Sequence, residues 1–130
     1  MLPIFDGHND VLLRLMRKSE PDGGVASFLN GDGAGQLDLP RARAGGFAGG
    51  LFAVFIPPRE KDADRDAMMA KPEYDVPLPE QSELNYAQAT AFEMISLLFR
   101  IQRRSESKVR VCRDVAEIRA AMQADALATA

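Results

Sequence analysis

The 130-residue chain has few of the side chains that bind metals or form disulfides: one histidine, His8, one cysteine, Cys112, and no tryptophan. A single cysteine excludes an internal disulfide. Because no base lies beside it in the sequence, Cys112 is expected to be a small buried hydrophobic side chain rather than a nucleophile. Structural zinc takes about four ligands, mostly from cysteine and histidine. The chain therefore cannot form a histidine-rich or cysteine-rich zinc site by itself.

Long apolar runs and an excess of basic charge are also absent. The longest strongly apolar stretch, residues 51–56, is far shorter than the roughly 20 residues that span a bilayer, and no basic region with an apolar signal core begins the chain. We therefore expect no membrane span, and a cytoplasmic or already processed protein. The formal net charge of -3, with basic residues dispersed among acidic ones, predicts no nucleic-acid partner.

The remaining composition is typical of a folded α/β protein. Hydrophobic residues make up 46% of the chain and charged residues 27%, as in ordinary globular domains. The apolar run near 50–56, bounded by glycine and proline, lacks the alternation of a one-sided sheet. It therefore predicts a strand buried on both faces, as in parallel sheets. A shorter strand is expected near residues 3–6.

Two helices are predicted in the second half of the chain. Apolar residues recur at helical spacing over 82–104, and we expect this stripe to be core: Leu84, Ala87, Ala91, Met94, Ile95, Leu98 and Ile101. Asp114 and Glu117 suit the capped start of another helix near 115–123. The small and apolar residues at 125–130 resemble the start of a further strand.

Shorter elements are expected in the first half. Residues 11–17 indicate a helix, and Asp38 with Pro40 indicates the capped start of a second one. Residues 19–36 are polar and rich in glycine, and residues 59–80 are charged and contain several prolines. We expect both of these segments to be loops.

The segment with the clearest chemistry is residues 3–10, where an apolar start runs into the single histidine. In an extended backbone, residues i and i+2 point to the same side, so His8 and Asp10 can converge while Asn9 faces away. We predict that His8 and Asp10 bind one metal ion, whose other ligands lie outside these 130 residues. On these residues alone, a hydrogen-bonded core histidine remains an alternative.

Asp6 precedes this pair and has two interpretations. It either orients the His8 ring, as a partner of a metal-bound histidine does, or caps the turn at Gly7. We favour the turn cap.

Two blocks of sequence, taken in order, resemble the membrane dipeptidase (renal dipeptidase) family. The first contains DGHND at residues 6–10, and the second contains DLPRARAGGFAGG at residues 38–50, followed by an apolar strand. The resemblance covers nearly the whole chain and is closest over residues 3–16 and 36–58.

The resemblance implies a metal-dependent (β/α)8 barrel related to the amidohydrolases. Two zinc ions at its carboxyl-end mouth would activate a bridging water that hydrolyses dipeptides, often with a D-amino acid at the C-terminal position. The first-strand ligands of that family carry over to His8 and Asp10. The bridging glutamate and two later histidines of the family have no matching position here, and we identify no catalytic acid or base.

Because such a barrel has about 250 residues, residues 1–130 are interpreted as the N-terminal part of a single barrel domain. The expected partners are a dipeptide and the remainder of the barrel. The loop at 57–80 would shape either the substrate entrance or a homodimer contact. Alone, the chain is expected to be marginally stable and inactive, because its strand edges would be unpaired and its metal site half built.

Three alternatives remain open. The first is a related amidohydrolase that acts on another small amide or a lactam, and the second is a non-catalytic protein of the same fold. The third concerns the metal, since a histidine and a carboxylate also suit manganese or cobalt.

Overall fold

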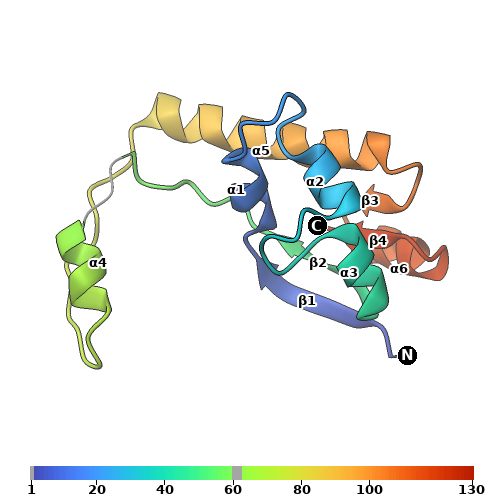
Figure 1. Cartoon of the computed structure of the whole chain (residues 1–130), viewed down its shortest axis with the longest axis horizontal. Coiled ribbons are helices and arrows are strands. Elements are labelled where there is room, and N and C mark those ends of the chain that lie inside the picture. Colours follow the sequence, from blue (N-terminus) through green and yellow to red (C-terminus); the bar gives the residue numbers. More distant parts are fainter. Residues whose placement is uncertain (1, 60–62) are drawn as a thin grey trace.

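The computed structural model describes residues 2–59 and 63–130. In these residues, parallel strands form one sheet in the order β1-β2-β4-β3 (Figure 1). The strands are β1 (Ile4–Asn9), β2 (Phe47–Phe52), β3 (Val109–Val111) and β4 (Leu127–Thr129). Each neighbouring pair is parallel. The prediction of an α/β fold with a parallel sheet is confirmed.

Helices α1, α2 and α5 pack against one another beside the sheet (Figure 1). The helices are α1 (Val11–Met16), α2 (Val25–Asn30), α3 (Leu39–Ala44), α4 (Ala63–Met69), α5 (Leu84–Arg104) and α6 (Val115–Gln123). Helix α3 contacts strand β2, and helix α6 contacts both β2 and β4. Fully buried side chains of the main core include Leu12, Leu15, Phe28, Met94 and Ile101.

Helix α5 confirms the prediction over 82–104 but buries a different stripe. Met94, Leu98 and Ile101 are buried as expected, whereas Leu84 is 67% exposed and Leu97, which the predicted stripe omitted, is buried. The helix follows a long excursion of the chain, so its first turn extends beyond the packed body (Figure 1). The predicted caps of α3 and α6 are confirmed, since Asp38 and Asp114 accept hydrogen bonds from the backbone amides of Arg41 and Glu117, respectively.

The position of β2 differs from the strand predicted over 50–56. β2 begins at Phe47, and beyond Phe52 the described chain has no strand until β3. Its end matches the end of β1, because Ala53 donates the last hydrogen bond of this pair to the carbonyl of Asn9. Phe55 lies past that point and is 49% exposed rather than buried on both faces. The hydrophobic run therefore indicated a strand, but pairing with β1 sets where the strand ends.

The prediction of a loop over 19–36 was wrong for its central part. Helix α2 lies there, with Val25 and Phe28 fully buried. The Phe28 ring packs edge-on against Phe52 of β2, with ring centroids 6.3 Å apart. Gly24, at the start of α2, has a φ of 82° and approaches Leu15 so closely that a Cβ would lie 2.8 Å from the Leu15 carbonyl oxygen. Glycine in this segment therefore allows close packing rather than only flexibility.

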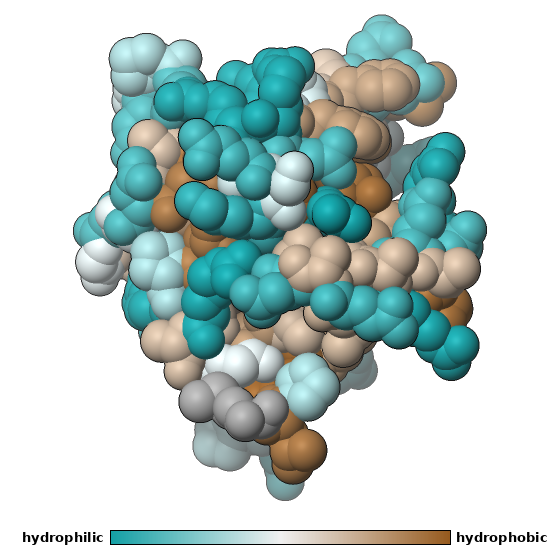
Figure 2. All heavy atoms as spheres, turned by 90° about the vertical axis from the view of Figure 1, so that its right-hand side faces the viewer, coloured by the Kyte–Doolittle hydropathy of each residue, from teal (hydrophilic) through white to brown (hydrophobic). Residues whose placement is uncertain are grey.

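Of the loop predicted over 59–80, residues 60–62 lie outside the described residues, and the remainder contains a short helix, α4. Figure 1 shows this helix on an arm that extends away from the sheet. Its Met68 and Met69 are 37% and 43% exposed. No helix in residues 2–59 or 63–130 is long and apolar enough to span a bilayer. The face of the molecule seen from the right of Figure 1 is largely hydrophilic, with apolar atoms in separate patches (Figure 2).

Strand β3 was not predicted, whereas β4 confirms the strand expected to begin within 125–130. On the side away from β4, two backbone amides of β3 are paired with side chains from the end of α5. Val109 donates to Ser105 Oγ at 3.0 Å, and Val111 donates to Gln102 Oε1 at 2.6 Å. These bonds pair two backbone amides that would otherwise be unpaired at the edge of the sheet. The adjacent Cys112 is buried, as predicted, and burial raises the pKa of its thiol.

Candidate metal site at the end of the first strand

The first strand ends with a β-bulge at the residues that carry the candidate site. Asp6 pairs with Gly50 and Asn9 pairs with Phe52, so β1 has one more residue than β2 between these pairs. A bulge bends the strand and redirects the side chains within it. The extra residue lies in the stretch that contains His8. The site is at the carboxyl end of the parallel strands, where barrel enzymes build their active sites.

The His8 and Asp10 side chains point toward each other. His8 Nε2 lies 3.4 Å from Asp10 Oδ2, and the two side chains are 67% and 52% exposed. His8 is therefore not a core residue, which removes the alternative interpretation of a lone histidine in apolar packing.

The backbone reason for this convergence differs from the one expected. β1 ends at Asn9, and Asp10 has φ -103° and ψ 29°, which is not extended. Asp10 instead occupies the N-cap position of α1. Within the described chain its side chain accepts no capping hydrogen bond, although Asp at this position usually does. Its carboxylate is turned toward His8.

Asp6 and Asn9 hold the backbone on either side of His8. Asp6 Oδ1 accepts a hydrogen bond from the backbone amide of His8 at 3.3 Å, and Asp6 Oδ2 accepts one from Asn9 Nδ2 at 3.0 Å. The carboxylate of Asp6 thus bonds to the backbone of the bulge, as in the turn-cap interpretation. Sequence reasoning missed Asn9, which it treated only as facing away. An asparagine directly before a helix cap was the available signal, because its amide can bond to nearby backbone.

The two donors fit a zinc ion in chemistry and in spacing. A neutral imidazole and a carboxylate are both ordinary zinc ligands, with bonds of about 2.0–2.2 Å, so two ligands at tetrahedral corners are about 3.3–3.6 Å apart. The separation of 3.4 Å lies within that interval. Among residues 2–59 and 63–130, no group of three or more histidine, cysteine, aspartate or glutamate side chains is placed to hold a metal. The pair can therefore be only part of a site.

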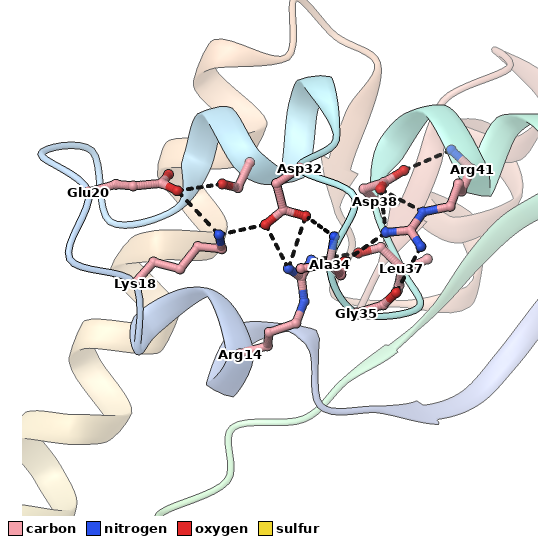
Figure 3. Close-up of polar contacts among 10 residues, drawn as sticks. Arg14, Lys18, Glu20, Asp32, Ala34, Gly35, Leu37, Asp38 and Arg41 are labelled. Atoms are coloured by element: carbon pink, nitrogen blue, oxygen red, sulfur yellow. Dashed lines mark hydrogen bonds and ion pairs between the residues drawn. The ribbon is translucent and has the colours of Figure 1, made fainter.

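A charge network further along α1 fixes the helix that follows Asp10 (Figure 3). Asp32 forms ion pairs with Arg14 and Lys18, which both extend from the α1 region. The Lys18 ammonium, helped by the Ala34 amide and the Arg14 charge, lowers the pKa of Asp32 well below its usual range. Arg14 also donates to the carbonyl of Leu37 at 2.9 Å. Helix α1 is thereby tied to the segment that leads into α3.

Asp38 continues this network at the start of α3 (Figure 3). It is 2% exposed and accepts hydrogen bonds from the Arg41 backbone amide at 2.9 Å and from Arg41 Nε at 2.7 Å. The Arg41 guanidinium lowers the pKa of this carboxyl, although burial opposes the shift. Arg41 also donates to the carbonyls of Ala34 and Gly35. The 31–38 segment is therefore fixed by charge-assisted hydrogen bonds.

Two solved structures of metallopeptidases are similar to this chain over almost its whole length. A metallopeptidase from Rhodobacter sphaeroides, crystallised with a phosphinate mimic of the dipeptide L-Ala-D-Ala, superposes with a TM-score of 0.87 at 40% sequence identity. A second solved structure, dipeptidase AC of family M19, has a TM-score of 0.84 at 41% identity. Both alignments cover 98% of this chain but only 36% and 35% of the respective relatives. The chain thus spans about a third of each.

A curated relative from Acinetobacter calcoaceticus, described as a protein in the PQQ-III 3′ region, is 49% identical over 57 residues, which are 44% of this chain and 18% of that protein. The described residues form a parallel α/β fold, and its solved relatives are dipeptidases of the TIM-barrel type. Residues 1–130 match the profile of the membrane dipeptidase family. The chain belongs to that family, peptidase family M19.

Proposed function

We propose that this chain supplies the first-strand metal ligands, His8 and Asp10, of a zinc-dependent dipeptidase. The observation that carries the proposal is the exposed pair at the carboxyl end of β1, with its facing nitrogen and oxygen 3.4 Å apart. Membership of the membrane dipeptidase family supports it independently. The remaining ligands would come from outside these 130 residues, since the described residues bring no third ligand to the pair.

The substrate class follows from the likeness to the Rhodobacter sphaeroides peptidase. That protein was crystallised with a phosphinate mimic of L-Ala-D-Ala. A phosphinate has tetrahedral phosphorus in place of the scissile carbonyl carbon, and such groups resemble the transition state of peptide hydrolysis. We propose dipeptides, including those with a C-terminal D-residue, as substrates here.

In this proposal, His8 and Asp10 hold the metal ion in place and do not transfer protons. His8 would bind through Nε2, the atom that faces Asp10, and Asp10 through Oδ2. When bound, zinc ions lower the pKa of a water molecule and polarise the scissile carbonyl. The bulge at the end of β1 and the start of α1 would hold these two side chains facing each other.

The test compares the 130-residue chain with a version extended at its C-terminus by the adjoining gene sequence. Purified samples are assayed for zinc content and for hydrolysis of L-Ala-D-Ala. We expect zinc and turnover in the extended protein, and neither in the short chain, because its site is incomplete. An extended protein that binds no zinc and leaves the dipeptide intact would refute the proposal.

A further inference from the structure

We infer that Asn9 is a positioning residue, whose amide holds the bulge so that His8 and Asp10 face each other. The expected effect on metal affinity rests on the proposed function. The hydrogen bonds of Asn9 do not depend on that proposal. Asn9 lies between the two proposed ligands and is partly buried. It contacts β1, β2 and α1 through one side chain.

The Asn9 amide uses both its nitrogen and its oxygen. Nδ2 donates to Asp6 Oδ2 at 3.0 Å and to the carbonyl of Leu51 at 3.3 Å. Oδ1 accepts a hydrogen bond from the backbone amide of Val11 at 3.4 Å. Aspartate could accept at Oδ1 but could not donate, and alanine could do neither. Among these three side chains, only the amide satisfies all three partners.

The bond to Val11 fixes the first amide of the helix that follows Asp10. Val11 is the first residue of α1, and the amides of a first helical turn need acceptors from outside the helix. An aspartate at the N-cap normally supplies one. Here the residue before the N-cap bonds to an amide of that turn, while the Asp10 carboxylate turns to His8. Asn9 thus holds the first amide of α1, while the Asp10 carboxylate, which at an N-cap would normally bond the second or third amide, faces His8.

The partner of Asn9 within β1 is itself held against β2. Asp6 lies opposite Gly50, where a Cβ would be only 3.0 Å from the Cβ of Asp6. The absence of a side chain at Gly50 therefore leaves room for Asp6. Asp6 accepts from the backbone amide of His8 and from the side chain of Asn9, so it links two consecutive residues of the bulge.

The experiment uses the C-terminally extended protein and three variants: Asn9→Ala, Asn9→Asp, and the double exchange Asp6→Asn with Asn9→Asp. Co²⁺ affinity is measured by titration of its visible absorption, and exchange of the Val11 amide by hydrogen–deuterium exchange. We expect Asn9→Ala to weaken Co²⁺ binding about tenfold, at the low end for residues that support a metal ligand. Exchange of the Val11 amide should accelerate because its acceptor is lost.

The two other variants separate hydrogen bonding from loss of packing. Asn9→Asp should weaken Co²⁺ binding more than Asn9→Ala, because it places a carboxylate against Asp6 and the Leu51 carbonyl. The double exchange should recover part of the loss, since an amide at position 6 can donate to a carboxylate at position 9. Asn30→Ala, at an exposed position at the end of α2, is the control and should match the parent protein.

Unchanged Co²⁺ affinity and unchanged Val11 exchange in Asn9→Ala would overturn the inference. Failure of the double exchange to improve on Asn9→Asp would do the same, because the hydrogen bond would then not be the cause. If the parent protein binds no Co²⁺, the proposed function fails. Val11 exchange in Asn9→Ala still decides whether Asn9 holds the bulge.

Discussion

Asp38 and Asp10 both stand at the N-cap of a short helix, yet their surroundings are opposite. Asp38 is 2% exposed, and it binds the backbone and the guanidinium of Arg41. The Asp10 side chain is 52% exposed and faces His8 across 3.4 Å. The same residue type in the same position thus supports the fold in one place and is left open to a ligand in the other. What separates the two is how many protein partners the carboxylate has.

The same contrast extends to the charges along α1. Asp32 is paired with Lys18, Arg14 and the Ala34 amide, all within the protein (Figure 3). The side chains of His8 and Asp10, at the start of the helix, are 67% and 52% exposed to solvent. Charged groups fully paired within a protein stabilise it, whereas preorganised open ones can bind a ligand with little rearrangement.

The largest effect on stability is expected for Asp38→Ala. The change removes a helix cap and leaves the Arg41 guanidinium without its carboxylate, so we expect the free energy of unfolding to fall by about 2–3 kcal/mol. Urea unfolding followed by circular dichroism measures this loss. A fall below about 0.5 kcal/mol would show that the buried carboxylate does not stabilise the fold. The contrast drawn between Asp38 and Asp10 would then be wrong.

A smaller effect is expected for Asp32→Asn, and it should depend on pH. The folded pKa of Asp32 is lowered from 3.8 by Lys18, Ala34 and Arg14, so its contribution is full above that unfolded value and is lost as pH falls toward the folded one. The variant should therefore be less stable than the parent at pH 6, and the two should approach each other below about pH 4. Urea unfolding at a series of pH values tests this. A difference that stays constant down to pH 2 would contradict the assignment.

The smallest effect on stability is expected for Asp10→Ala. Its exposed side chain makes no capping hydrogen bond within the described chain, so the free energy of unfolding without metal should change by no more than about 0.5 kcal/mol. Thermal unfolding in the presence of a chelator, alongside Asp38→Ala, provides a matched pair. A loss as large as that of Asp38→Ala would mean that Asp10 is a structural cap after all.

Much of the fold was predictable because it depends on local patterns. The spacing of apolar residues indicated α5, and aspartates three residues before the amides that they cap indicated α3 and α6. Helix α2 was not predictable in this way, because it has six residues and its burial comes from contact with Leu15 and Phe52. The end of β2 depends on where β1 ends, which is also a long-range property.

In the candidate site, too, local features were predictable from the sequence and long-range ones were not. The neighbouring positions of His8 and Asp10 predicted that the two side chains would meet, and they do. The cause was not predictable from alternation along a strand, because a bulge and a helix start lie between the two residues. The role of Asn9 depends on the Leu51 carbonyl, which is 42 residues away in the sequence.

The most direct test of the central claim is the zinc content of the extended protein carrying His8→Ala, measured by mass spectrometry after dialysis against a fixed free zinc concentration. His8 and Asp10 are taken to bind one cation together, so we predict loss of about one zinc ion per chain relative to the parent, with the same loss in Asp10→Ala. Zinc content equal to that of the parent in both variants would remove this pair from the metal site and contradict the account.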